Sequence, residues 1–137
     1  MKKSNLKKLF ADAEEDLRHA KKELYRPIED VVNFSACVFT RQALYKYLLG
    51  LSLVNAEENN DPVQEDNTLE KLIKYNSKYN EALKSIDFSM LSCKCHKMQE
   101  EGEEDLVYCT NVDKVNYCSD LSESVREILI EKKPSLL

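Results

Sequence analysis

The chain is poor in the residues that make tight turns. Its 137 residues hold two glycines, three prolines and no tryptophan. Tight β-turns depend strongly on glycine and proline, so a fold built from many hairpins is excluded. Charged residues make up 33% of the chain and apolar residues 42%, and the abundant leucine, lysine and glutamate favour helices. The composition therefore predicts an all-α fold, and the length fits a single domain over residues 1–137.

A long apolar run is also missing. The first eight residues are charged but contain no apolar core of signal-peptide length. The most apolar stretch is interrupted by Asn33, Thr40, Arg41, Gln42 and Lys46, so it is not a membrane span. Five cysteines, an odd number, in a chain without an export signal favour reduced thiols over a disulfide framework. We therefore expect a cytoplasmic protein that makes no contact with a membrane.

The net charge of −5 excludes a generally basic nucleic-acid binder, but the charge is unevenly distributed. Residues 1–50 contain ten Lys/Arg and seven Asp/Glu, a net charge of +3, whereas residues 51–137 contain ten and eighteen, a net charge of −8. An anionic ligand is therefore expected to meet the N-terminal part. Ordinary surface charge on helices explains the same distribution and is the simpler interpretation.

Apolar residues recur at steps of three and four in four segments, the spacing of amphipathic helices. The first predicted helix covers residues 4–25, with Ser4 as its N-cap. The second begins at Pro27, which suits a first helical turn, and runs to residue 54, before a polar loop at residues 55–67. Asn67 and Glu70 form a capping box for a third helix that runs to residue 86. An acidic loop covers residues 100–105, and the last helix covers residues 112–132 and ends before Pro134.

Residues 34–51 form a segment that is apolar on nearly every face of a helix. A helix of this kind must be buried on most sides. Small side chains such as Ala36 and Ala43 let neighbouring helices approach closely. We therefore predict that this helix is the centre of an up-and-down bundle of four to five helices.

Two segments of the chain resemble motifs of the HEPN domain (higher eukaryotes and prokaryotes nucleotide-binding). Residues 36–49 follow the order of its second helix, with a start of small and aromatic residues, the step Gln42-Ala43 and the finish Lys46-Tyr47-Leu48-Leu49. Residues 67–72 correspond to its His-x-Leu-x-x-Leu motif with the histidine missing. The resemblance covers residues 9–130, and it implies a HEPN-like bundle of about five helices opened by two long antiparallel ones.

The nuclease motif of HEPN members that cut RNA is missing. That motif is an Arg followed after four to six residues by His near the last helix, and the chain contains only His19 and His96, neither at that distance from an Arg. Histidine is the usual proton carrier for metal-independent RNA cleavage, so no catalytic residue is predicted. The resemblance therefore implies a non-catalytic accessory protein, related to toxin–antitoxin pairs, that partners a nucleotidyltransferase or binds a nucleotide or RNA.

Two other functions remain open on the residues alone. A divergent, toxin-like HEPN ribonuclease would use His19 or His96 together with Arg18, Arg41 or Arg126. A purely structural protein–protein interaction bundle would need no ligand at all. We also expect a homodimer, because the seven tyrosines exceed the needs of the core and the apolar breadth of the second helix exceeds what one small bundle covers.

Basic residues near the end of the first helix are the main candidates for ligand binding. Arg18, His19, Lys22 and Arg26, together with Lys21, form a patch that can receive a phosphate. The simpler interpretation is a solvated face, because acidic residues on the same helix can pair with these groups. Arg41 interrupts the buried second helix, where a structural ion pair with Glu29, Asp30 or an acidic residue of the last helix is favoured over ligand recognition.

Cysteine and histidine gather in one later segment. The candidate zinc ligands are Cys93, Cys95, His96 and Cys109. No Cys-x-x-Cys pair, the usual spacing of zinc ligands, is present. Structural zinc normally stabilises domains with a small core, whereas the apolar pattern of this chain indicates a large core. We therefore expect no metal and no other cofactor.

Overall fold

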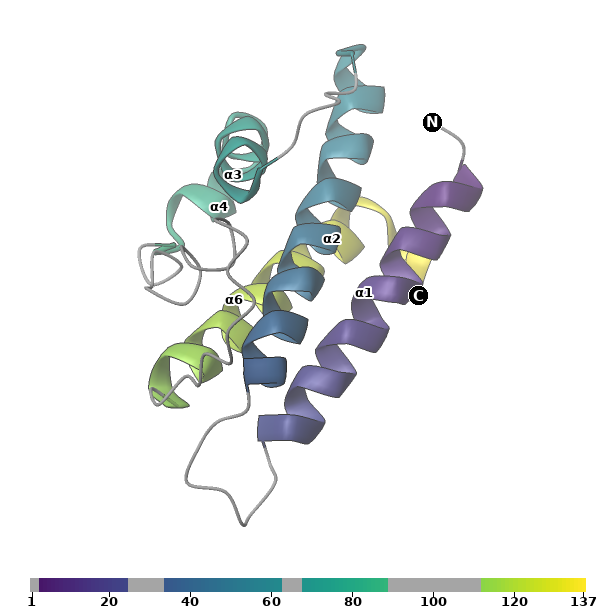
Figure 1. Cartoon of the computed structure of the whole chain (residues 1–137). Coiled ribbons are helices and arrows are strands. Elements are labelled where there is room, and N and C mark those ends of the chain that lie inside the picture. Colours follow the sequence, from purple (N-terminus) through teal and green to yellow (C-terminus); the bar gives the residue numbers. More distant parts are fainter. Residues whose placement is uncertain (1–2, 25–33, 63–67, 89–111) are drawn as a thin grey trace.

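The computed structural model describes residues 3–24, 34–62, 68–88 and 112–137. This part of the chain is helical and contains no strand. Its elements, drawn in Figure 1, are α1 (Lys3–Leu24), α2 (Phe34–Asn59), α3 (Leu69–Ser77), α4 (Glu81–Lys84), α6 (Val112–Lys132) and the 3₁₀ helix η2 (Pro134–Leu136). The predicted all-α, up-and-down helical bundle is therefore confirmed.

Helix α2 is the centre of the bundle. It contacts α1, α3 and α6, and α1 also contacts α6. Figure 1 shows α1 and α2 side by side with opposite chain directions, and α3 and α4 on the other side of α2. The α2 residues Leu44, Tyr47, Leu48 and Leu51 are fully buried, as expected for a helix that is apolar on most faces.

The outer helices contribute one apolar face each. Their fully or nearly fully buried apolar residues are Leu6, Phe10, Ala13, Leu17 and Ala20 of α1, Leu72 of α3, Leu83 of α4, and Cys118, Leu121, Val125 and Leu129 of α6. These residues recur at helical spacing, so the amphipathic pattern identified the buried faces correctly.

Gly50 of α2 lies where both α1 and α6 pack close to the central helix. A Cβ atom at this position would lie 3.2 Å from Leu129 Cδ2 of α6 and 3.3 Å from Leu6 Cδ1 of α1. Both distances are shorter than ordinary van der Waals contact. The absence of a side chain at Gly50 therefore allows α1 and α6 to pack on α2 at the same level.

The second predicted helix was too short at its C-terminal end. Residues 55–59, predicted as loop, form the last turns of α2. Asn55 and Ala56 are buried there, so this end of the helix packs into the bundle although most of its residues are polar. The helix ends at Asn59, and the next residue, Asn60, has a left-handed φ of 54°. The amide of Asp61 donates to the carbonyl of Ala56 at 3.0 Å, as in a helix C-cap.

The third predicted helix is divided in two, and its cap was assigned to the wrong residue. The Oγ1 atom of Thr68 accepts from the backbone amide of Lys71 at 3.2 Å, which makes Thr68 the N-cap. The predicted cap, Asn67, lies outside the described residues. Helix α3 ends at Ser77, and Asn80 has an extended backbone (φ −131°) before the single turn of α4. Asn80 Nδ2 donates to the carbonyl of Asn76 at 3.0 Å, a local bond that competes with helix continuation.

Helices α1 and α6 agree with the helices predicted from the sequence, with small differences at their ends. Helix α6 has the predicted bounds, and Pro134 is the first residue of η2. Helix α1 begins at Lys3, so Ser4 lies inside its first turn and does not precede it. Within the ranges described above, no helix is both long and apolar enough to cross a membrane.

Candidate functional site

A groove of about 460 Å³ runs between α1 and α6. Its lining residues are Glu14, Leu17, Arg18 and Lys21 of α1 and Glu123, Arg126 and Glu127 of α6. The four α1 residues are spaced by three, one and three positions, which places them on one face of the helix. The volume falls in the range of small-molecule sites, which is roughly 300–1,000 Å³.

The inner wall of the groove, formed by Glu14 and Arg126, belongs to a hydrogen-bonded group from three helices. Arg126 of α6 donates to both carboxylate oxygens of Glu14 of α1, from Nε at 2.5 Å and from Nη2 at 3.2 Å. The hydroxyl of Tyr47 of α2 also donates to Glu14 Oε1, at 2.5 Å. Tyr47 is 0% exposed, and the guanidinium of Arg126 lies 6.0 Å from the ring centroid of Phe10. We call Glu14, Tyr47 and Arg126 the hub.

The hub keeps fixed protonation states at neutral pH. Burial raises the pKa of Glu14, but the hydrogen bonds from Arg126 and Tyr47 outweigh it, and the pKa lies below its usual value. Burial and the hydrogen bond to Glu14 raise the pKa of Tyr47. The hydrogen bond to Glu14 raises the pKa of Arg126. The hub therefore consists of a carboxylate, a guanidinium and a neutral phenol, and none of them is poised to exchange a proton near pH 7.

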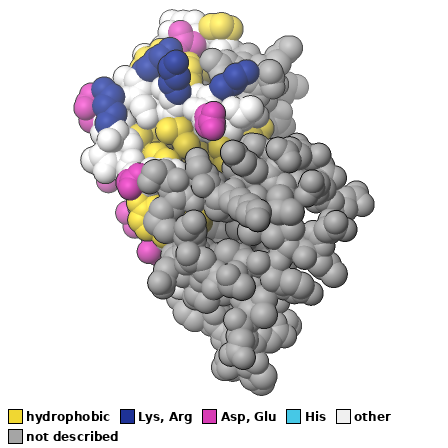
Figure 2. Space-filling view, turned by 60° about the vertical axis from the view of Figure 1, so that its left-hand side comes forward, with side chains coloured by type: hydrophobic (Ala, Val, Ile, Leu, Met, Phe, Trp, Pro, Cys, Tyr) yellow, Lys and Arg dark blue, Asp and Glu magenta, His cyan; other side chains and the backbone are white. Residues whose placement is uncertain are grey.

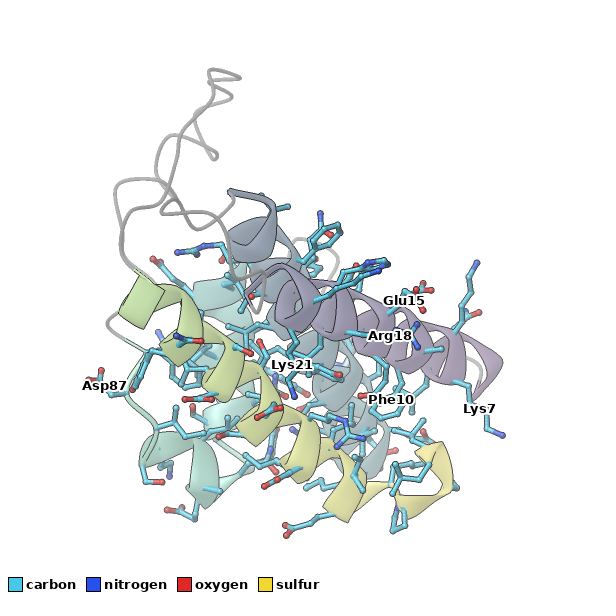
Figure 3. All side chains as sticks on the ribbon, turned by 90° about the horizontal axis from the view of Figure 1, so that it is seen from below. Lys7, Phe10, Glu15, Arg18, Lys21 and Asp87 are labelled. Atoms are coloured by element: carbon cyan, nitrogen blue, oxygen red, sulfur yellow. The ribbon has the colours of Figure 1, made fainter. Side chains whose placement is uncertain are left out.

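The ion pairs at the mouth of the groove are held much less firmly. Lys21 pairs with Glu123 across the groove, and Arg18 pairs with Glu15 on its own helix. The Arg18 side chain is 70% exposed, and both members of the Lys21–Glu123 pair are also well exposed. Exposed pairs of this kind stabilise a protein by about 0–1 kcal/mol. Figure 3 shows Arg18 beside Glu15 on α1 and Lys21 in the region between α1 and α6.

The predicted ligand-binding residues are distributed over several places. Arg18 lines the groove, whereas Lys22 is exposed and is not among the lining residues. The His19 ring stacks on Phe39 with centroids 5.1 Å apart, and its Nε2 lies 3.2 Å from Glu15 Oε1. Arg41 is buried at 6% exposure in α2. The remaining candidate, Arg26, lies outside the described residues, as do Glu29 and Asp30, two of the partners predicted for Arg41.

The sequence did not reveal the hub. Glu14 and Tyr47 are 33 positions apart, and Glu14 and Arg126 are 112 apart. No local motif connects residues at such distances. Arg126 entered the sequence argument only as a member of the ribonuclease alternative, and Tyr47 only as part of the apolar central helix.

No metal site is found in the part of the chain that the structure describes, since no three His, Cys, Asp or Glu side chains come together there. The zinc candidates Cys93, Cys95, His96 and Cys109 lie outside this part. No protein-family model, curated protein or solved structure matches the chain. The resemblance to HEPN domains stays a prediction that rests on the two sequence motifs.

Proposed function

We propose that this protein is a non-catalytic, HEPN-like accessory protein that binds the phosphate of a nucleotide in the groove between α1 and α6. Arg18 and Lys21 bind the phosphate, and Leu17 provides the apolar part of the wall. One observation carries this proposal. Two exposed cations, Arg18 and Lys21, which are held only by weak ion pairs, line the same groove as the firmly bonded Glu14 and Arg126.

The energetics of the charged groups support an anion at this position. Arg18 and Lys21 are separated by one helical turn, so both side chains can reach one phosphate. Their present ion pairs are exposed and contribute only about 0–1 kcal/mol each, so little free energy is lost when these cations change partners. A phosphate that offers several oxygens can therefore replace Glu15 and Glu123 as the partner of the two cations.

The hub does not take part in this exchange. Arg126 makes two hydrogen bonds to Glu14, and Glu14 has a third from buried Tyr47. Opening the hub would leave a buried phenol without its acceptor, which costs about 1–3 kcal/mol. The hub therefore acts as a positioning group that holds α1 and α6 at a fixed separation, while Arg18 and Lys21 bind the ligand.

Binding is favoured over RNA cleavage for a specific reason. His19 is the histidine nearest to Arg18 in the chain, but it stacks on Phe39, pairs with Glu15 and is not among the groove-lining residues. A general acid or base must reach the reacting group within hydrogen-bond distance. His19 therefore gives the ribonuclease alternative no support in this groove.

Isothermal titration calorimetry tests the proposal with ATP, AMP, adenosine and inorganic phosphate as separate ligands. We expect ATP and AMP to bind and adenosine to bind at least tenfold more weakly, because it lacks the phosphate. Arg18→Ala and Lys21→Ala should each weaken AMP binding about tenfold. The matched control is Lys22→Ala, which removes an exposed lysine from the same helix but not from the groove, and it should leave binding unchanged.

Two results would contradict the proposal. Equal binding of AMP to Arg18→Ala, Lys21→Ala and the unchanged protein would show that the groove does not receive the phosphate. If none of the four ligands binds, the groove is only a polar contact region between two helices. That result would favour the alternative of a purely structural interaction bundle.

The accessory role has a separate test. The resemblance to HEPN proteins without the nuclease motif implies a nucleotidyltransferase as partner. A pull-down from native lysate, with the Lys22→Ala and Arg18→Ala variants as matched baits, should therefore recover that enzyme with each variant. If no nucleotidyltransferase is recovered, the proposed partnership is wrong. The calorimetry would still test whether the groove binds a nucleotide.

A further inference from the structure

A second cluster lies at the corner where α2 leads to α3, away from the groove-lining residues. Asp61 Oδ2 accepts hydrogen bonds from two phenols, from Tyr75 at 3.0 Å and from Tyr79 at 2.5 Å. The two rings meet edge to face with centroids 5.5 Å apart and an interplanar angle of 67°. Lys78 Nζ lies 5.9 Å from the Tyr75 centroid. Tyr79 is 36% exposed, one of two large apolar side chains that reach this exposure among the described residues.

This arrangement fixes an exposed aromatic ring in one orientation. The hydroxyl of Tyr79 is anchored by Asp61, and its ring packs edge to face with Tyr75. The hydrogen bonds from Tyr79 and Tyr75 hold the pKa of Asp61 below its usual value, so the carboxylate accepts both bonds at neutral pH. An exposed ring with a single orientation loses little conformational entropy when a flat group stacks on it.

Three exposed lysines lie on the helix that precedes Tyr79. Lys71 and Lys74 on α3 and Lys78 at its C-cap are all exposed, and their spacing of three and four positions places them on one face. Figure 2 looks onto the side formed by α3 and α4, where basic and acidic side chains lie close together at the upper end. The acidic groups nearest in the chain are Asp61, which is engaged by two phenols, Glu70 in the first turn of α3, and Glu81 in the first turn of α4, which pairs with Lys84. Asp61 and Glu81 are therefore already engaged within the protein, whereas the side chains of Lys74 and Lys78 are exposed to solvent.

We propose that this face binds single-stranded nucleic acid, with a base stacked on Tyr79 and the backbone phosphates on Lys74 and Lys78. An aromatic platform beside a basic stripe is the combination that sequence-independent single-strand binding uses. A duplex offers no free base face to the ring, and an acidic peptide offers charge to the lysines but no partner for the ring. The site shares no residue with the groove, so it goes beyond the function proposed above.

Fluorescence anisotropy with a labelled oligouridine of roughly eight nucleotides tests this site, since such a strand spans the usual site size. We expect binding that weakens about tenfold in Tyr79→Ala, the size of effect that loss of one stacked base produces. Tyr79→Phe keeps the ring but loses the hydrogen bond to Asp61, and it should bind within about threefold of the unchanged protein. Circular dichroism of each variant confirms that the fold is retained.

The salt dependence tests the lysines separately. The double variant Lys74→Ala/Lys78→Ala should lower the slope of log K against log salt by about 1.4, because each single-strand phosphate contact contributes about 0.7. Lys7→Ala is the matched control, since Lys7 is an exposed lysine on α1. Its side chain lies near the N-terminal end of α1 in Figure 3. This control should leave the slope unchanged.

Three outcomes would overturn the assignment. The first is no oligouridine binding up to about 100 μM, the weak end of non-specific nucleic-acid binding. The second is equal binding of a duplex with no effect of Tyr79→Ala, which would show general attraction of a polyanion. The third is tighter binding of a polyglutamate peptide than of oligouridine, which would make the face a protein-docking surface. Tyr79→Ala should leave AMP binding in the groove unchanged, because Tyr79 is not among the groove-lining residues, so failure here is distinct from failure of the groove.

Discussion

Replacement of Asn76 by leucine should reveal how firmly α3 is attached to the bundle. Asn76 is 0% exposed, and its Oδ1 accepts from Asn55 Nδ2 at 2.9 Å. Its Nδ2 lies within hydrogen-bond distance of the carbonyl of Leu72 (2.9 Å), the hydroxyl of Ser52 (2.9 Å) and the carbonyl of Leu48 (3.1 Å). One side chain of α3 is thus bonded to three positions along α2.

The magnitude follows from what the substitution leaves behind. Asn76→Leu removes the acceptor of the buried Asn55 amide, and an unsatisfied buried donor costs about 1–3 kcal/mol. Loss of the bond to Ser52 adds about 0.5–1.5 kcal/mol. We therefore expect the free energy of unfolding to fall by about 3 kcal/mol, a large part of the roughly 5–15 kcal/mol typical of a domain.

The double variant Asn55→Leu/Asn76→Leu should cost less than the sum of the two single variants. It removes both buried amides, so neither is left without a partner. Lys132 Nζ, which donates to Asn55 Oδ1 at 2.9 Å, keeps its second acceptor, Glu58 Oε2, at 3.0 Å. The coupling between the two positions isolates the direct hydrogen bond between Asn55 and Asn76.

Urea unfolding followed by circular dichroism at the helix band measures these free energies. Asn59→Ala is the matched control, because Asn59 is an exposed asparagine whose Nδ2 donates to the carbonyl of Asn55 at 2.8 Å. It should cost less than about 1 kcal/mol. If Asn76→Leu destabilises the protein no more than Asn59→Ala, or if the two leucine substitutions are additive, the buried network does not fix α3.

Four further predictions concern the core, two titrating groups and the assembly. Leu129→Ala, at a fully buried position of α6, should lower the free energy of unfolding by about 2–5 kcal/mol in the same urea assay, while the exposed Leu137→Ala should leave it unchanged. Burial and the bond to Asp61 raise the pKa of Tyr75 to about 12, so its contribution to stability is fully present below pH 10 and is lost as the pH rises from about 10 to 12; Tyr75→Phe should reduce this alkaline loss. For the depressed pKa of Glu14 the sign is opposite, so its contribution should be lost as the pH falls below about 4.5, and Glu14→Gln should reduce the acid sensitivity in urea titrations at pH 3–7. Light scattering should give the mass of a homodimer, and a mass of 15.9 kDa would contradict that expectation.

The long helices were predictable because their evidence is local. Helix α6 has the bounds that its apolar spacing predicted, and the core positions Val125 and Leu129 are fully buried. The burial of α2 followed from a segment that is apolar on most faces, since such a segment must be covered by neighbours. Hydrophobic periodicity is a property of one helix and needs no knowledge of the others.

The end of α2 was not predictable for the opposite reason. The segment that contains Asn55, Glu57, Glu58 and Asn59 has the composition of a loop. It is helical because Asn55 is buried against Asn76 and bonded to Lys132, which lie 21 and 77 positions away in the chain. A buried polar network stabilises a helix only when all its members are present, and no single segment reveals it.

The same distinction explains which site residues could be anticipated. Arg18 was a candidate because a run of basic residues is visible in one segment, and it does line the groove. Lys22 belongs to the same run but is not among the lining residues, since one face of α1 carries only every third or fourth residue. Tyr79 could be identified only as part of a surplus of tyrosines, because its anchor, Asp61, lies 18 positions away in a segment with no apolar pattern.

The extension of α2 also connects the fold to the second proposed site. Because residues 55–59 are helical, the chain turns at Asn60 and brings Asp61 to the level of Tyr75 and Tyr79. Asn76, adjacent to Tyr75, fixes α3 to α2 at the same level. Asn76→Leu should therefore weaken oligouridine binding as well as stability, whereas Leu129→Ala, on α6, should lower stability and leave the affinity of the folded fraction unchanged. Equal loss of affinity in both variants would show that the ring is positioned by the stability of the whole bundle and not by the network that joins α2 to α3.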